Sequence, residues 1–390
     1  MPKIRNPDYT DILEFATQNT ALRVCSKRLK YLSFVSISLV TFSDMRSLMK
    51  TVKVGINGVG RIGRTILRAY FARVAKDANY NFEIVAVNNP GEPKPYVHLL
   101  KHDSLHGKLQ GDFAFDNDKR EISYNGRKIK FFSSRNPEEL DWSSVGAQIV
   151  IDCTGIFKDK AKLGAHMRGT VKKVIMCAPG KDLDGTFVMG INNEQYDTNK
   201  HHIISNASCT TNCLAPLVKV LIENFGIVNG LMTTVHSYTS DQNLLDNAHE
   251  DLRRARAANL SMIPTSTGAA KALGEVIPEV KGKLDGYAVR VPTPDVSMVD
   301  LTVVLEKKAT KEEINEAMKK ASETNLKGIL GFTSEELVSQ DFMGTTESSI
   351  IDSKLTNVIG NTAKIVSWYD NEVGFSNRVV DLANFIGQKL

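Results

Sequence analysis

The sequence predicts an α/β protein in two parts: a doubly wound parallel sheet, followed by an α+β part with a mixed or antiparallel sheet. Three observations lead to this prediction. Short apolar segments alternate with amphipathic helical segments from residue 51 to about residue 208, as in parallel sheets covered by helices on both faces. A glycine-rich turn joins the first apolar segment to a helical one. Beyond residue 209, longer segments alternate apolar and polar residues, which is typical of strands with one buried face.

The composition narrows the functional classes. The chain has 390 residues, of which 42% are hydrophobic, enough for two domains with cores of their own. A formal net charge of +5 favours small anionic ligands and is too small to indicate nucleic acid. The five cysteines have neither disulfide nor metal spacing. We therefore expect no metal site, no nucleic-acid or membrane partner, and a reducing, cytoplasmic location.

Residues 1–50 differ from the rest of the chain. A basic stretch precedes an apolar run from Tyr31 to Phe42, which is shorter than the ~20 residues that a bilayer-spanning helix needs. A basic flank with serines is typical of a targeting segment, but Asp8 and Glu14 occur early and no small-residue cleavage site is obvious. We expect a poorly ordered extension, and targeting stays open as the alternative.

The ordered chain begins with the pattern of a βαβ unit. Val52–Asn57 is a short apolar strand, an amphipathic helix runs to about Ala75, and Phe82–Asn88 is the next strand. The turn between the first strand and the helix contains Gly58, Gly60 and Gly63. This context makes the motif specific for a Rossmann-type dinucleotide site, because the glycines let the backbone approach a pyrophosphate and the helix supplies N–H donors.

Three more buried strands are expected at residues 148–152, 174–176 and 202–204. Each ends in small or polar residues, and ligands of doubly wound sheets bind at the carboxyl ends of the strands. The residues at these ends are Thr154–Gly155, Cys177–Gly180 and Ser205–Asn206.

Asn89 follows the second strand, where dinucleotide folds normally carry an acid for the ribose hydroxyls. A carboxylate would repel the 2′-phosphate of NADP, whereas an amide forms hydrogen bonds without repelling charge. The sequence therefore leaves both NAD and NADP open as cofactor. A simple turn role for Asn89, before Pro90 and Gly91, also stays open.

Cys209 stands between a buried strand and an apolar helical run, Leu214–Phe225. This order predicts a thiol at a helix N-terminus, where the helix dipole favours the thiolate. His236 follows at the end of another strand. A cysteine and a histidine at such termini are typical of covalent catalysis, although residues in a packed core are the alternative.

The second part continues with strands at residues 231–236, 286–291, 299–306 and 364–370. Thr310 and Glu313 form a capping box that opens a helix to about Thr324. A final helix is expected from about Ser376. Hydroxyl and guanidinium groups recur along this part and suit phosphate recognition, although a solvated basic face is the alternative for some arginines. They are Thr239, Ser240, Asp241, Arg253, Arg254, Arg256, Thr265, Thr267, Gly268 and Arg290.

Six segments together resemble the phosphorylating glyceraldehyde-3-phosphate dehydrogenases, and the similarity runs from about residue 51 to the C-terminus. The segments occur in the order of that family. They are Ile56–Gly63, Asp103–Gly107, Ser205–Cys213, Asp251–Arg256, Arg290–Pro294 and Ser367–Glu372.

The resemblance implies a role for each matching position. Cys209 is the expected nucleophile, and His236 is its partner. The substrate and phosphate contacts are expected at Ser208, Thr210, Thr239, Asp241, Thr267, Gly268 and Arg290. The cofactor contacts are expected at Gly58, Gly60, Arg61, Ile62, Gly63, Asn89, Arg135, Thr154, Gly155, Cys177 and Asn371.

The family also implies a reaction and an assembly. D-glyceraldehyde 3-phosphate and inorganic phosphate would give 1,3-bisphosphoglycerate, reversibly, through a hemithioacetal and a thioester on Cys209, with NAD or NADP. Residues 236–262 match a loop that reaches a neighbour's cofactor in a homotetramer. We expect an N-terminal extension at 1–50, a dinucleotide-binding domain at 51–208 completed by the helix at 373–390, and a catalytic domain at 209–372.

The sequence departs from the family at several positions. Asn89 replaces an Asp, and Ala248 stands where NAD-specific members commonly carry Pro. Both departures weaken the expectation of strict NAD use. Cys177 replaces a Ser near the nicotinamide, and Val373 and Phe375 replace aromatic residues. Erythrose-4-phosphate dehydrogenase, and a binding or adhesion protein on the same scaffold, stay open as alternatives.

Overall fold

The computed structural model describes residues 51–76 and 82–390. The expectations for residues 1–50 lie outside this range. Among the described residues, no helix combines the length and the apolar character that a membrane span requires.

The first half of the described chain builds a sheet of nine strands, in the order β10-β11-β9-β8-β1-β2-β7-β6-β5. The strands from β10 to β7 are parallel, and β6 and β5 form an antiparallel edge. These strands are β1 (Val52–Asn57), β2 (Phe82–Asn88), β5 (Phe113–Asp116), β6 (Glu121–Tyr124), β7 (Arg127–Phe132), β8 (Ile149–Asp152), β9 (Lys173–Met176), β10 (Gly185–Thr186) and β11 (Ile203–Ser205). The doubly wound parallel sheet is confirmed.

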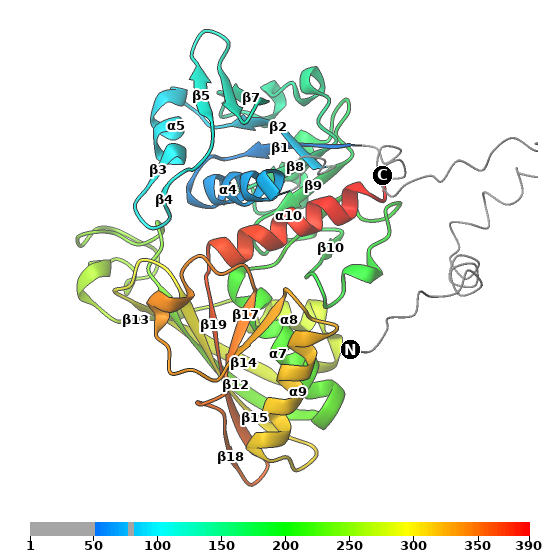
Figure 1. Ribbon diagram of the computed structural model, residues 1–390, viewed down its shortest axis with the longest axis vertical. Coiled ribbons are helices and arrows are strands. Elements are labelled where there is room, and N and C mark those ends of the chain that lie inside the picture. Colours follow the sequence, from blue (N-terminus) through cyan, green and yellow to red (C-terminus); the bar gives the residue numbers. More distant parts are fainter. Residues whose placement is uncertain (1–50, 77–81) are drawn as a thin grey trace, which may run out of the picture. The chain divides into compact units, whose positions relative to one another are not determined.

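Helices cover this sheet because its central strands are apolar on both faces. Helix α4 (Arg61–Lys76) packs against α10 (Val373–Gly387), so the C-terminal helix returns to the first sheet (Figure 1). Tyr70 and Phe71 of α4 share a core with Val379 and Ile386 of α10. The other elements of this half are α5 (Pro93–Lys101), α6 (Lys160–Leu163) and the two short strands β3 (His102–Asp103) and β4 (Gly107–Lys108).

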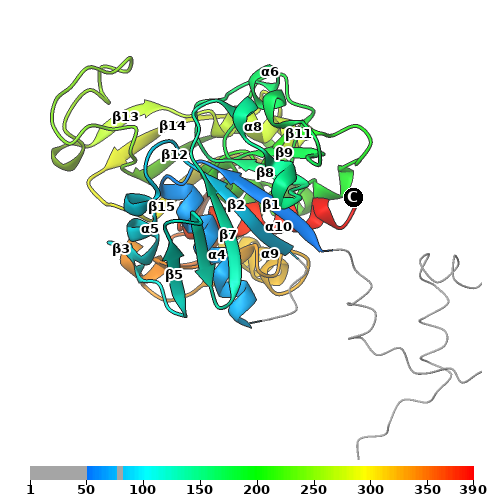
Figure 2. The same cartoon turned by 90° about the horizontal axis from the view of Figure 1, so that it is seen from above.

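The second half forms an eight-stranded mixed sheet within the described residues, in the order β13-β14-β12-β15-β19-β17-β16 with β18 beside β19. Its strands are β12 (Ile227–Ser237), β13 (Ile263–Ser266), β14 (Leu284–Val291), β15 (Ser297–Leu305), β16 (Leu330–Thr333), β17 (Ser349–Asp352), β18 (Asn357–Ile359) and β19 (Thr362–Tyr369). Helices α7 (Cys209–Phe225), α8 (Ala269–Val276) and α9 (Lys311–Glu323) lie together beside this sheet in Figure 1. The view from above, in Figure 2, shows β12, β13 and β14 side by side. The expected mixed sheet is confirmed.

Local signals predicted most element ends well. The capping box of α9 forms as expected, with Thr310 accepting from the N–H of Glu313 and Glu313 accepting from the N–H of Thr310. The last helix begins at Val373 rather than near Ser376. Asp370 lies just before this start, and its Oδ1 accepts from the backbone N–H groups of Glu372 and Val373.

Candidate active site

A tight turn between β11 and α7 sets the position of Cys209. Ala207 takes a left-handed conformation, with φ of 58°, and its N–H donates to the hydroxyl of Ser205. Ser208 then caps α7 by accepting from the N–H of Thr211 at 3.1 Å. Cys209 is the first residue of the helix. The predicted thiol at a helix N-terminus is therefore confirmed, and the left-handed Ala207 stores backbone strain next to it.

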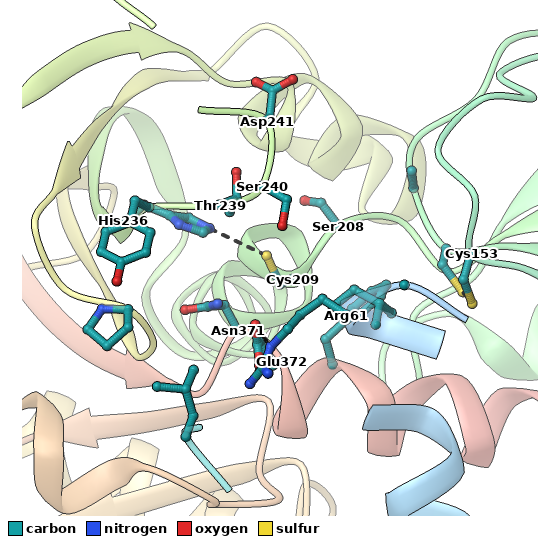
Figure 3. A pocket seen from close by; sticks show the side chains of 18 of the residues that line it. Arg61, Cys153, Ser208, Cys209, His236, Thr239, Ser240, Asp241, Asn371 and Glu372 are labelled. Atoms are coloured by element: carbon teal, nitrogen blue, oxygen red, sulfur yellow. Dashed lines mark hydrogen bonds and ion pairs between the residues drawn. The ribbon is translucent and has the colours of Figure 1, made fainter. Parts of the chain in front are cut away.

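His236 reaches Cys209 from the end of β12. Its Nε2 lies 3.6 Å from the Sγ of Cys209, as the dashed line in Figure 3 shows. Because β12 and β14 are parallel with His236 opposite Arg290, the guanidinium reaches the other side of the imidazole. The Nη1 of Arg290 lies 2.7 Å from Nδ1 of His236 and donates to the carbonyl of Ser237 at 3.0 Å.

Burial shifts the pKa of both members of this pair. It raises the pKa of Cys209, against the opposing effects of Arg290 and Thr210. Burial, reinforced by the charge of Arg290, lowers the pKa of His236 to about 3. Burial thus disfavours the charged form of each group taken singly. The N-terminus of α7 and the contact with His236 act in the opposite direction at Cys209, so the expected thiolate stays a prediction.

A cavity of about 710 Å³ opens in front of Cys209. Its wall includes many of the residues expected from the sequence: Gly60, Arg61, Ile62, Thr154, Cys177, Ser208, Cys209, His236, Thr239, Asp241, Arg290 and Asn371. The structure thus brings the expected thiol, imidazole, phosphate contacts and part of the glycine turn to one cavity. Within the described part of the chain, the Nε of Arg290 is buried without a hydrogen-bond partner, which fits a site for an anionic ligand.

Some expected phosphate contacts are engaged elsewhere. The hydroxyl of Thr210 is buried against the Tyr369 hydroxyl, at 2.9 Å. Asp241 lines the cavity, but its carboxylate pairs with Arg254 at 2.6 Å rather than with Arg290. Thr267 and Gly268 lie just before α8 and are not on the wall of this cavity.

The glycine turn has the shape that a dinucleotide requires. A Cβ at Gly63 would lie 2.0 Å from the carbonyl oxygen of Gly58, so helix α4 packs directly on the turn. Gly58 has a φ of 96°, which favours glycine. A Cβ at Gly60 would meet nothing within 4 Å, because that position faces open space. The turn and the free N–H groups at the start of α4 therefore fit a pyrophosphate.

Two polar side chains on the wall of the first cavity, Arg61 and Asn371, are fixed by their neighbours. The guanidinium of Arg61 donates to Glu372 at 2.7 Å and to Asp103 at 2.6 Å, so it is already neutralised. The Oδ1 of Asn371 accepts from the hydroxyls of Ser237 and Ser297. This arrangement leaves the NH₂ group of Asn371 as the donor available to a ligand.

A second cavity, of about 530 Å³, lies along the other side of the turn. Among the expected cofactor residues, its wall includes Gly58, Gly60, Asn89, Arg135 and Thr154. The Oδ1 of Asn89 accepts from the N–H of Val59 at 2.9 Å and so braces the glycine turn. Gly60 and Thr154 line both cavities, so the two cavities lie next to each other along the glycine turn. Gly155, with a φ of 68°, is outside both walls.

Several wall residues were missed by the sequence analysis. Tyr238, Pro294, Ser104 and Leu105 line the first cavity, although the sequence assigned none of them a role. Tyr238 directly follows β12, so the rule that ligands bind at carboxyl ends of strands could have found it. The others come from loops whose position depends on tertiary packing.

A cluster of one histidine and two buried carboxyl groups lies close to Glu372, the ion-pair partner of Arg61. Ligand atoms of His106, Asp295 and Asp370 are within 4.8 Å of one another. Burial, with the nearby charges of Asp370 and Glu372, raises the pKa of Asp295 to about 8. The expectation of no metal site stays a prediction.

Together, the fold and this site define an oxidoreductase with a nicotinamide dinucleotide cofactor. Sequence comparisons identify the family. The profile described as "Glyceraldehyde 3-phosphate dehydrogenase, NAD binding domain" matches residues 52–160, and its "C-terminal domain" counterpart matches residues 208–371. The chain belongs to the glyceraldehyde-3-phosphate dehydrogenase family.

Curated relatives cover nearly the whole described chain. "Glyceraldehyde-3-phosphate dehydrogenase 2" of Trichormus variabilis is 54% identical over 340 residues, which is 87% of this chain and 99% of the relative. "Glyceraldehyde-3-phosphate dehydrogenase" of Geobacillus stearothermophilus is 54% identical over 339 residues, with the same shares covered. The enzyme of the same name from Streptomyces coelicolor is 52% identical over 342 residues, 87% of this chain and all of the relative.

Proposed function

We propose that the chain catalyses the reversible oxidation and phosphorylation of D-glyceraldehyde 3-phosphate to 1,3-bisphosphoglycerate. The observation that carries this proposal is the Cys209 thiol, 3.6 Å from the imidazole of His236 in a cavity that continues to the glycine turn. The names of the relatives support the substrate. Catalysis would belong to residues 209–372, and cofactor binding to residues 51–208 and 373–390.

Cys209 and His236 perform the covalent step. The thiol adds to the aldehyde carbon while Nε2 of His236 takes its proton, which gives a hemithioacetal. The protonated imidazole and the backbone N–H of Cys209 hold the new oxyanion. A nicotinamide dinucleotide, held along the glycine turn and by the NH₂ group of Asn371, would supply the hydride acceptor for this carbon. The product on Cys209 is a thioester. Inorganic phosphate attacks its carbonyl carbon, the bond to the Cys209 sulfur breaks, and the acyl phosphate leaves.

Arg290 links substrate binding to the strength of the base. Its guanidinium lies 2.7 Å from Nδ1 of His236 and lowers the pKa of the imidazole. The C3 phosphate of the substrate, bound by Arg290 and Thr239, neutralises that charge. His236 then becomes a better base only when substrate is present. Ser208, Thr267 and Gly268 would serve the inorganic phosphate, and Thr210 would contribute its backbone N–H, since its hydroxyl is engaged by Tyr369.

A steady-state assay of the full chain tests this function. Formation of reduced cofactor is followed with glyceraldehyde 3-phosphate or erythrose 4-phosphate, with and without inorganic phosphate. We expect sustained turnover only with the triose and phosphate together, and a single burst without phosphate, because the thioester then accumulates. A higher kcat/KM with erythrose 4-phosphate than with glyceraldehyde 3-phosphate would contradict the proposal. Turnover that does not depend on inorganic phosphate would also contradict it.

We propose that both NAD and NADP are accepted, because the adenosine end of the site carries no acid at position 89. Asn89 is neutral, and the exposed guanidinium of Arg135 lies on the wall of the same cavity. A neutral amide does not repel a 2′-phosphate, and a guanidinium attracts it.

Replacing Asn89 with aspartate should move this preference toward NAD. A carboxylate at position 89 can still accept from the N–H of Val59, and it adds repulsion toward the 2′-phosphate. We expect the NAD to NADP ratio of kcat/KM to rise about tenfold or more. The control is Asn89→Ser, which removes the amide without adding charge. An unchanged NAD to NADP ratio of kcat/KM in Asn89→Asp would show that residue 89 does not contact the ribose.

We also propose a cytoplasmic homotetramer. The segment 244–262 exposes large apolar side chains, with Leu244, Leu252 and Leu260 each more than 70% accessible to solvent. Such exposure on one loop is typical of a surface that is buried on association. The size of the assembly is measurable by light scattering of the purified chain.

A further inference from the structure

Two thiols that the catalytic mechanism does not use meet at the edge of the first sheet. Cys153 directly follows β8 and Cys177 directly follows β9. The two strands are parallel with Asp152 opposite Met176, and the N–H of Cys177 donates to the carbonyl of Asp152. The Sγ atoms of the two cysteines lie 3.4 Å apart.

The geometry is close to that of a disulfide. Neighbouring strands are about 4.8 Å apart, inside the range of about 4.4–6.8 Å between Cα atoms that a disulfide spans. Bond formation needs the sulfurs to approach by roughly 1.4 Å, to the S–S length of about 2.05 Å. Both cysteines are partly exposed, whereas Cys213 is fully buried.

Cys153 and Cys177 lie on the walls of the cavities in which we propose that the cofactor binds. Cys153 lines both cavities, and Cys177 lines the one that contains Cys209. In Figure 3 the labelled Cys153 is well apart from Cys209, with Arg61 between them. A change in this pair therefore acts where the cofactor passes from one cavity to the other, not on the nucleophile itself.

We propose that Cys153 and Cys177 form a reversible disulfide that weakens cofactor binding. Drawing the sulfurs together moves the ends of β8 and β9, and with them Thr154 and Ala178, which also line the cavity. This inference goes beyond the proposed catalytic function, and disulfide formation does not depend on turnover.

The oxidant is a disulfide of low molecular weight, such as oxidised glutathione or oxidised dithiothreitol. One protein thiolate attacks a sulfur of the reagent to give a mixed disulfide, and the second protein sulfur then displaces the reagent. One protein S–S bond forms, two protein S–H bonds are lost, and the reagent disulfide is reduced to two thiols that receive both protons.

The surroundings of the pair set the rate. The hydrogen bond with Cys177, together with burial, raises the pKa of Cys153 well above its ordinary value. Because the thiolate is the attacking species, oxidation should be slow at neutral pH and faster as the pH rises.

Redox titration of the full-length Cys209→Ser variant tests the proposal. This background removes the catalytic thiol, which could otherwise pair with another cysteine. The protein is equilibrated with mixtures of oxidised and reduced dithiothreitol, alkylated after denaturation, and analysed by peptide mass spectrometry. We expect loss of two of the four remaining thiols, with one peptide linkage between Cys153 and Cys177. No linkage in a large excess of oxidised dithiothreitol, or a linkage between other cysteines, overturns the proposal.

Matched variants in the same background separate the pair from other thiols. Cys153→Ser and Cys177→Ser should each lose no thiols, whereas Cys213→Ser should still lose two. Loss of two thiols on oxidation of the Cys153→Ser or the Cys177→Ser variant contradicts the assignment.

Cofactor binding supplies the second readout. We expect the oxidised Cys209→Ser protein to bind NAD at least about fivefold more weakly than the reduced protein, as for linked equilibria of ordinary strength. By reciprocity, saturating NAD should raise the midpoint potential of the pair by about 20 mV for a fivefold effect, because NAD stabilises the reduced form. Equal affinity in the two redox states would overturn the effect on the cofactor.

Discussion

Replacing Cys209 with serine should lower kcat/KM for glyceraldehyde 3-phosphate by about 10⁴-fold or more. A serine hydroxyl is a far weaker nucleophile than a thiol, and it cannot form the thioester that phosphate attacks. The measurement is reduced-cofactor formation with the full-length variant under saturating phosphate. Because the Cys209 side chain is partly buried at a helix start that Ser208 caps, the smaller oxygen should not disturb the fold.

Cofactor affinity is the control for this variant. The glycine turn and Asn371 do not depend on the thiol, so the Kd for NAD, measured by quenching of protein fluorescence, should change less than about threefold. Turnover within tenfold of the parent enzyme would show that another group is the nucleophile.

Replacing His236 with asparagine should have the second largest effect. General base catalysis contributes about 10²–10⁴-fold, and asparagine cannot take the proton of Cys209. The pKa of His236 is lowered to about 3, so the imidazole is neutral and able to accept a proton at every pH above about 4. Proton transfer from thiol to imidazole moves no proton to or from solvent. The reactivity of Cys209 in the parent enzyme should therefore change little between pH 5 and 8.

The pH profile distinguishes a base from a packing residue. Without His236, the reactive thiolate forms only by loss of a proton to water, and its fraction rises about tenfold per pH unit below the raised pKa of Cys209. The measurement is the rate of Cys209 alkylation by iodoacetamide, read by mass spectrometry at each pH. A flat profile in His236→Asn, or an equally steep one in the parent enzyme, would contradict the role of His236 as base.

The sequence predicted well those features that depend on neighbours along the chain. The strand–turn–helix unit from Val52 to Asn88 forms as expected, because apolar runs, glycines and helix periodicity are local signals. The helix start at Cys209 and the capping box at Thr310 are local for the same reason. The motifs also placed His236 and Arg290 among the candidate residues before any geometry was known.

The packing of distant segments sets which candidate residues meet and how their pKa values shift. The parallel register of β12 and β14 places Arg290 against His236, and burial then makes the imidazole a neutral base. The hydroxyl of Thr210 forms a hydrogen bond with the hydroxyl of Tyr369, which is distant in sequence. Cys153 and Cys177 become a pair only because β8 and β9 are neighbours. The family, most of the elements and the reactive groups were predictable from the order of residues, because each depends on a local pattern. Distances, burial and protonation were decided by packing, because they depend on contacts between residues that the chain order does not bring together.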